Sequence, residues 1–305
     1  MKKINIAQIG YGYWGKRLYR YLKSHKGFNL KYVCAFNIKE EKEFIKDINK
    51  IWNDKTIKAI VVATPIETHY LFTKKALLCN KSVLCEKPLV LRKKEAIELK
   101  KIAEKRNLLL LTEFTYTFSK SLEKAKKFID SDELGKIDAI EMSLKYAGRF
   151  LKYNVYWLLA SHLLSILDVF ISLKNLNFKK VDFIKHKKRT ETGMILFQNK
   201  NASGKITVSL NYPEKEMKVI IYGQKGTLVY SSMIKPSLKF ICYEKTEGIL
   251  GDKLITKEKS YFIDEKNNLE HAVEYFYKAL RKQAKSNIDR AVLVTEILEK
   301  LNKKL

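Results

Sequence analysis

The stretch that decides the fold spans residues 3–15 and reads Lys3-Ile4-Asn5-Ile6-Ala7-Gln8-Ile9-Gly10-Tyr11-Gly12-Tyr13-Trp14-Gly15. Its first half is an apolar run, typical of a parallel strand that is buried on both faces. After the glycines, Leu18 and Leu22 lie four residues apart, which predicts a helix. The stretch therefore predicts a strand, a tight turn and a helix in direct succession.

Three glycines, Gly10, Gly12 and Gly15, have the spacing G-x-G-x-x-G across this turn. In a dinucleotide-binding unit the first permits the tight turn, the second lets a pyrophosphate approach, and the third lets helix and strand pack closely. The helix N-terminus then offers N–H groups and a positive dipole end to the phosphates. The alternative is an ordinary glycine-rich turn. The strand before the glycines and the helix after them favour dinucleotide binding.

Composition predicts a globular protein of about two domains in 305 residues. No segment approaches the ~18 uninterrupted apolar residues of a membrane span, and the first strand follows Met1 too closely for a signal peptide. The four cysteines (Cys34, Cys79, Cys85 and Cys242) show no C-x-x-C spacing, and Cys34 and Cys85, which lie in apolar strand-like runs, read as small buried thiols. We therefore expect a reduced, cytoplasmic protein without metal ligands or a membrane anchor.

The net charge of +27 raises the alternative of a nucleic-acid-binding protein. Only eight of the 60 basic residues are arginine, the residue that phosphate-clamping surfaces favour, and the lysines are spread over the whole chain. A lysine-rich composition is the preferred explanation. We expect no nucleic-acid partner, although the charge can help to bind an anionic cofactor or substrate.

Strands and helices are expected to alternate up to about residue 113, as in a parallel sheet. The strands are expected near 28–36, 43–46, 58–63, 82–85 and 108–111, and helices near 68–79 and 93–106. Residues 37–57 are too few for a full crossover helix and a strand. A turn and a short strand are expected there, followed by a short helix that carries Ile48, Ile51 and Trp52. This predicts a dinucleotide-binding Rossmann domain over residues 1–117.

The remainder, residues 118–305, is predicted to be an α+β domain with an open, mostly antiparallel sheet. Residues 205–211 alternate apolar and polar side chains, as does a strand with one buried face. Further strands are expected near 139–144, 194–197, 218–222 and 227–230, with a turn at Gly223-Gln224-Lys225-Gly226. Helices are expected near 122–129, 156–170, 269–285 and 289–301.

With these motifs in hand, the chain resembles the Gfo/Idh/MocA family, named for glucose–fructose oxidoreductase and inositol dehydrogenase. The resemblance covers essentially the whole length. It depends on the glycine stretch, on Ala63-Thr64-Pro65 with His69 shortly after, and on Glu86-Lys87-Pro88 after a strand, the most specific of the three. His162 on an apolar helix and the turn at 223–226 add to it.

The resemblance implies an NAD- or NADP-dependent oxidoreductase, and the Tyr-Trp-Gly version resembles members that act on sugars or nucleotide sugars for surface glycans. The catalytic residues would be Lys87, which holds the reacting hydroxyl, and His162, which accepts its proton. The open sheet would join subunits into a homo-oligomer, a dimer or tetramer. The implied cofactor-binding residues are Gly10, Gly12, Tyr13, Trp14, Gly15, Thr64, Pro65, His69, Glu86 and Lys87.

Two positions depart from the family pattern. Leu158 stands where members commonly have an aspartate, four residues before the histidine, and Ala35 stands where an acid would bind the adenosine ribose. A protein that keeps the fold but has lost turnover, and acts in binding or regulation, is therefore the competing hypothesis. Without the acid, Lys39 could meet a 2′-phosphate, so the choice between NAD and NADP stays open.

Overall fold

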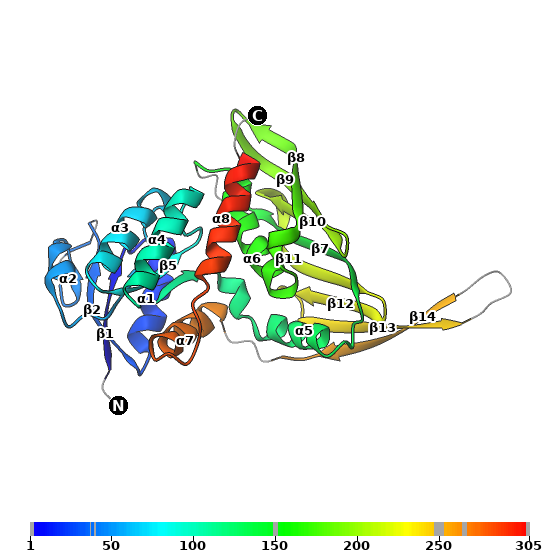
Figure 1. The fold of residues 1–305 in the computed structure, drawn as a ribbon, viewed down its shortest axis with the longest axis horizontal. Coiled ribbons are helices and arrows are strands. Elements are labelled where there is room, and N and C mark those ends of the chain that lie inside the picture. Colours follow the sequence, from blue (N-terminus) through cyan, green and yellow to red (C-terminus); the bar gives the residue numbers. More distant parts are fainter. Residues whose placement is uncertain are drawn as a thin grey trace. The chain divides into compact units, whose positions relative to one another are not determined.

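The computed structural model describes residues 3–36, 38–39, 41–148, 152–246, 253–263 and 267–302. By its internal packing the chain divides into two units (Figure 1). Unit 1 comprises Met1–Phe118 and Lys266–Leu305, and unit 2 comprises Ser119–Glu265. The first boundary lies next to the expected one at 117/118. The C-terminal helices, however, group with unit 1, whereas the sequence-based division had assigned them to the second domain.

Unit 1 is built on a six-stranded sheet in the order β3-β2-β1-β4-β5-β6. All neighbouring strands are parallel. This is the strand order of a doubly wound Rossmann fold, whose ligands bind at the carboxyl ends of the strands. The strands are β1 (Ile4–Ile9), β2 (Phe28–Cys34), β3 (Phe44–Ile45), β4 (Ala59–Val62), β5 (Ser82–Glu86) and β6 (Leu110–Glu113).

The link between β2 and β3 is as short as the sequence predicts. Val33 and Cys34 already pair with Phe44 and Ile45, and no described residue between them is helical; Asn37 and Glu40 fall outside the described residues. The helices described in the first 118 residues are α1 (Tyr13–Ser24), α2 (Asn49–Asn53), α3 (Ile66–Leu78), α4 (Lys93–Lys105) and the 3₁₀ turn η1 (Thr115–Phe118).

Two C-terminal helices, α7 (Asn268–Leu280) and α8 (Ile288–Asn302), complete unit 1. Leu269, Val273 and Phe276 of α7 share one core with Ile6 and Leu18. The segment before α8 is tied to β6, because Asn287 accepts from the Thr112 amide at 2.8 Å and donates to its carbonyl at 2.8 Å. Apolar burial and these paired backbone groups explain why the helices belong to this unit.

Unit 2 is built on an eight-stranded sheet in the order β14-β13-β12-β11-β7-β10-β9-β8. Its strands are antiparallel, except that β10 and β7 run parallel. The expected turn at 223–226 joins β11 and β12, with Gly223 opposite Gly226. The strands are β7 (Ile137–Ala147), β8 (Asn177–His186), β9 (Arg189–Gln198), β10 (Ser203–Ser209), β11 (Asn211–Gly223), β12 (Gly226–Ser231), β13 (Leu238–Thr246) and β14 (Lys253–Tyr261).

Helices cover one face of this sheet. On β7, Ile140, Met142 and Leu144 are buried while the residues between them are half-buried, so one face packs against α5 (Lys120–Asp130) and α6 (Ser161–Phe170). A π-helical turn, η2 (Tyr156–Ala160), leads into α6, and a 3₁₀ turn, η3 (Leu173–Asn175), follows it. Among the described residues, no helix has the length and apolar character needed to cross a membrane.

Candidate active site

The glycine turn between β1 and α1 has the three features that the spacing predicts. Gly10 has φ +97°, and a methyl group on it would lie 2.3 Å from the carbonyl oxygen of Ala63. A methyl group on Gly15 would lie 2.5 Å from the carbonyl oxygen of Gly10. Around Gly12 nothing described lies within 4 Å of such a methyl group. Two glycines are therefore required by packing, and the middle one leaves the backbone open to a ligand.

Gln8 supports this turn from inside the sheet. Its side-chain amide donates to the carbonyl oxygens of Gly10 at 2.7 Å and Gly15 at 2.9 Å. The side chain is fully buried, so it fixes the distance between the two ends of the turn. Sequence reasoning counted Gln8 only as part of the strand, because its contacts become visible once the turn has closed.

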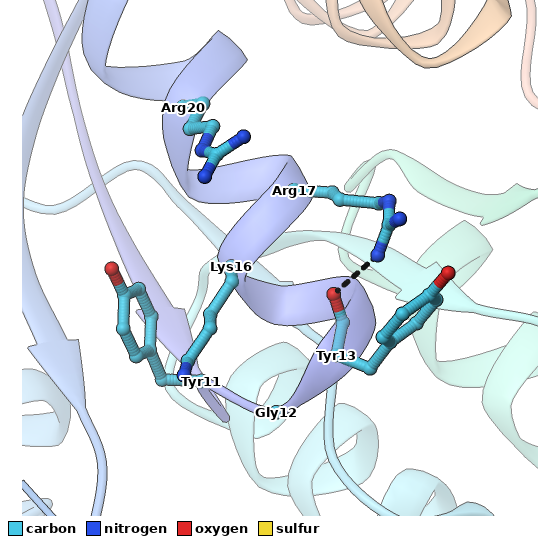
Figure 2. A pocket seen from close by; sticks show the side chains of 6 residues that line it. All are labelled: Tyr11, Gly12, Tyr13, Lys16, Arg17 and Arg20. Carbon is cyan, nitrogen blue, oxygen red and sulfur yellow. Dashed lines mark hydrogen bonds between the residues drawn. The ribbon is translucent and has the colours of Figure 1, made fainter.

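The N-terminus of α1 is arranged for an anion. Gly12 is its N-cap, no side chain caps the helix, and its first turn contains no acidic residue. A cavity of about 450 Å³ lies here, and Figure 2 shows the side chains that line it. Basic and tyrosine side chains supply most of its lining, which comprises Tyr11, Gly12, Tyr13, Lys16, Arg17 and Arg20. These features fit the pyrophosphate of a dinucleotide, which needs N–H donors and positive charge.

Two expected cofactor residues, Tyr13 and Trp14, lie on the first turn of α1. They are 48% and 42% exposed, and their rings meet edge to face at 5.3 Å. The Arg17 guanidinium lies 3.7 Å from the Tyr13 ring centre and donates to the Tyr13 carbonyl oxygen at 3.4 Å (Figure 2). The first turn of the helix thus carries two large exposed aromatic rings, one of them held against a cation.

The end of β2 lacks the carboxylate that usually binds a ribose. Ala35 stands there, and its amide donates to the Ile45 carbonyl oxygen at 3.1 Å. The nearby carboxylate of Glu43 is already engaged, because it accepts from the Tyr19 hydroxyl at 2.6 Å and from Lys23 at 2.7 Å. Lys39 is exposed just beyond the strand.

His69 joins the ends of β4 and β5. It is 1% exposed, and its ring nitrogens lie 2.9 Å from the carbonyl oxygens of Thr64 and Pro88. Pro88 follows a cis peptide bond after Lys87, and Pro65 is exposed. The structure thus brings the two motifs together at one edge of the sheet and places His69 between them.

Lys87 lies at the carboxyl end of β5, half-buried, beside two buried carboxyl groups. Glu86 and Glu113 are register partners across β5 and β6 and are 5% and 1% exposed. Burial raises the pKa of Glu86 above its ordinary 4.5, as does the charge of Glu113. Burial also raises the pKa of Glu113, against the Thr115 hydrogen bond and the charge of Lys87, which lower it.

Burial acts on Lys87 in the opposite sense. It lowers the pKa of the amine below 10.5, while the charges of Glu86 and Glu113 raise it. Sequence reasoning did not single out Glu113, because its place beside Glu86 follows from strand register. The signal that could have found it is an acidic residue at the end of a buried strand, which is rarely there without a partner.

His162, the other expected catalytic residue, belongs to unit 2. It is 6% exposed near the start of α6, and its carbonyl oxygen accepts from the Ser165 hydroxyl at 2.7 Å. Leu158, in the position of the family aspartate, is buried in the π-helical turn and 8% exposed. The segment around His162 is therefore apolar, as its sequence predicts.

Comparison with known proteins agrees with this arrangement. Residues 4–114 match the model of the Gfo/Idh/MocA family, described as an oxidoreductase family with an NAD-binding Rossmann fold. The matched segment, residues 4–114, is thereby identified as the NAD-binding Rossmann domain of this oxidoreductase family. The matched part of unit 1 is accordingly an NAD(P)-binding Rossmann domain, and the glycine turn lies within it.

The curated relative that the chain matches is distant. The uncharacterised oxidoreductase YhhX of Escherichia coli K12 is 29% identical over 156 residues, which cover 47% of this chain and 44% of YhhX. The match therefore spans less than half the length of that curated relative.

Solved structures show the same fold over nearly the whole chain. GenD2 from gentamicin A biosynthesis, in complex with NAD, has a TM-score of 0.81 at 18% identity and covers 98% of this chain and 93% of its own. UDP-N-acetylglucosamine 3-dehydrogenase GnnA from Acidithiobacillus ferrooxidans has a TM-score of 0.82 at 15% identity, with 99% and 97% covered. At such identities the likeness establishes the fold of both units and nothing finer.

Proposed function

We propose that this protein is an NAD(P)-dependent oxidoreductase that transfers a hydride between a nicotinamide cofactor and a hydroxyl or keto carbon of a sugar or nucleotide sugar. The observation that carries the proposal is the position of Lys87, an amine held half-buried at the carboxyl end of β5, at the same edge of the parallel sheet as the glycine turn after β1. The family supports the reaction class. The names of GnnA and GenD2 support a sugar as substrate, and the Tyr-Trp-Gly version supports a place in surface glycan biosynthesis.

Different residues of the chain would bind the cofactor, stabilise the reacting oxygen and accept the proton. Gly10, Gly12 and Gly15 would hold the pyrophosphate at the start of α1, and the cofactor supplies or takes the hydride when bound. The Lys87 ammonium would donate to the reacting oxygen and stabilise the negative charge that develops on it. His162 would accept the hydroxyl proton as a general base. His69 would keep the Thr64 and Pro88 carbonyls, and with them the two motif loops, at a fixed distance.

A second candidate function has its own observation. Leu158 puts a buried apolar side chain where the family commonly has a carboxylate, and Ala35 removes the ribose acid. A member that binds a cofactor or sugar without turnover, as a binding or regulatory protein, fits these two positions. The two candidates differ in turnover, so they can be separated by experiment.

The test begins with titration of the purified protein with NADH and NADPH, followed by nicotinamide fluorescence. Oxidation of a panel of nucleotide sugars is then assayed with the preferred cofactor. In an active enzyme, His162→Ala should lower turnover by about 10²–10⁴-fold with cofactor affinity nearly unchanged. Lys87→Ala should lower turnover comparably and raise KM as well.

Matched controls use exposed residues of the same type. Lys94→Ala on α4 and His186→Ala on β8 should keep wild-type turnover, since both side chains are exposed. Wild-type rates in both Lys87→Ala and His162→Ala would eliminate the proposed catalytic residues. Tight cofactor binding with no oxidation of any sugar tested would favour the binding protein, and Leu158→Asp would then show whether a carboxylate restores activity.

A further inference from the structure

The ends of β5 and β6 hold more acidic groups than one lysine can balance. Glu86 and Glu113 face the same register position, and parallel neighbours lie about 4.8 Å apart. Each carboxyl has one oxygen, Oε1, that is buried without a hydrogen-bond partner among the described residues. The other oxygens are engaged, because the Lys87 amide donates to Glu86 at 3.2 Å and the Thr115 hydroxyl donates to Glu113 at 2.6 Å.

Three charge states are conceivable for this cluster. With both carboxyls ionised, two like charges lie side by side in the interior, which disfavours the state. With both protonated, the Lys87 ammonium has no charge of opposite sign within the cluster. With one proton on the pair, one carboxylate balances one ammonium, and one of the two unpartnered oxygens becomes a donor.

We propose that Glu86 and Glu113 share one proton in the folded protein, and that the single negative charge of the pair keeps Lys87 in its ammonium form. Glu113 is then a positioning residue, which acts on the reaction through Lys87. The shared proton does not depend on the proposed function. Only the effect of Glu113 on turnover rests on the proposed function.

The titratable groups around the pair are few. Lys87 follows Glu86 on the same chain segment, and Cys85 precedes it with a thiol whose pKa burial raises to about 12, so the thiol stays neutral. From α3, His69 acts on Glu86 and lowers the pKa of that carboxyl, less strongly than Lys87. The surrounding groups therefore stabilise one ionised carboxylate in the pair. They do not supply a second positive charge, equal to that of Lys87, that would stabilise two.

Infrared spectroscopy tests the shared proton without substrate or cofactor. A protonated carboxyl absorbs as an isolated C=O stretch above the amide I band, at a pH where exposed glutamates are ionised. We expect this band in the wild type at about pH 6 and its loss in both Glu86→Gln and Glu113→Gln, since the remaining carboxyl beside Lys87 then ionises. Glu104→Gln, an exposed glutamate of α4, is the control and should keep the band.

A second measurement reads the state of Lys87. The neutral amine, not the ammonium, reacts with an acylating reagent such as N-hydroxysuccinimidyl acetate, and modification at Lys87 is quantified by peptide mass spectrometry. Each single variant keeps one carboxylate, so its rate should stay within about twofold of the wild type. The double variant Glu86→Gln/Glu113→Gln should react roughly tenfold faster, the change that a pKa lower by one unit produces.

The outcomes decide the proposal. No carboxylic acid band in the wild type, or a band that survives in Glu113→Gln, overturns it. Clear acceleration in both single variants, with more in the double variant, also overturns it, because each carboxyl would then carry a full charge of its own. If the double variant does not fold, the infrared result decides alone. A protein without oxidoreductase activity would leave both readouts intact, so failure of the proposed function is distinguishable.

Discussion

The Cα of Gly15 lies so close to the main chain of Gly10 that a methyl group on it would approach the Gly10 carbonyl oxygen to 2.5 Å. The obstructing atom is backbone, and Gln8 holds it in place through its own hydrogen bond to the same oxygen. A side chain at Gly15 must therefore move the turn, the helix or both.

We expect Gly15→Ala to lower the free energy of unfolding by roughly 1–3 kcal/mol, the usual cost of overpacking a well-packed site. Urea unfolding, followed by circular dichroism, measures this cost. NAD(P)H affinity should fall as well, because the turn that receives the cofactor is displaced. Wild-type stability in Gly15→Ala would contradict the close approach.

Gly12→Ala should behave in the opposite way. Nothing described lies within 4 Å of a methyl group there, and φ is −74°, which any residue adopts. Stability should change by no more than about 1 kcal/mol, the difference between glycine and alanine at an N-cap. Affinity for NADH and NADPH should fall at least tenfold, because the methyl group occupies the path of the pyrophosphate. Fluorescence titration compares both variants, and unchanged affinity in Gly12→Ala would place the phosphates elsewhere.

The end of β2 leads to a prediction about the coenzyme. With Ala35 in place of an acid, no carboxylate of this position repels a 2′-phosphate, and Lys39 adds a positive charge. We expect NADPH to bind no more weakly than NADH. Lys39→Gln should weaken NADPH alone, and the exposed Lys55→Gln serves as its control. A tenfold preference for NADH, about 1.4 kcal/mol, would contradict the prediction.

The Glu86–Glu113 pair predicts how stability depends on pH. Burial raises the pKa of both carboxyls above 4.5, so the folded protein retains a proton that the unfolded chain has lost. The stabilisation is complete below about pH 4.5 and is lost as the pH rises through the folded value. From about pH 5 to 7 the free energy of unfolding should decline by about 1.4 kcal/mol per pH unit for this one proton.

Glu113→Gln removes the retained proton, so its stability should decline less steeply over the same range than that of the wild type. Urea unfolding at three pH values, with Glu104→Gln as control, measures the two slopes. Parallel slopes for wild type and Glu113→Gln would contradict the prediction.

The uncovered face of the sheet in unit 2 is where we expect copies of the chain to associate. It carries ion pairs, such as Lys205 with Glu141 at 3.1 Å, beside half-buried Thr207, Ile220 and Tyr222. We propose a homo-oligomer, a dimer or tetramer, through this face. Light scattering at micromolar concentration should give a multiple of 35.7 kDa. Ile220→Lys should lower that mass, and Leu71→Lys, exposed on α3, should not; a monomeric wild type would contradict the proposal.

Local patterns in the sequence were enough for much of the fold. The apolar run before Gly10, the glycine spacing and the short segment after β2 each depend on neighbouring residues only, and the structure confirms what they predict. Strands β8, β13 and β14 were not predicted. In β8 and β14, charged residues are frequent on both faces, as at the edge of a sheet, so the apolar alternation that marks a half-buried strand is weak.

The candidate site likewise contains residues that local motifs reveal and residues that only the folded structure reveals. Lys87 and the glycines could be found because they belong to short motifs. Gln8 and Glu113 could not, since their importance comes from contacts with residues on other strands or beyond the turn. The helix α7 has an apolar face that is plain in the sequence, but an amphipathic pattern does not say which core will receive it.

That helix has a consequence for how the protein is made. The core of unit 1 includes Leu269, Val273 and Phe276, which a ribosome reaches long after Phe118. At about 5–20 residues per second, roughly eight to thirty seconds separate the two segments. Throughout that interval the nascent Rossmann sheet exposes the apolar surface that α7 will later cover. The sheet is therefore most dependent on a chaperone before α7 has been synthesised.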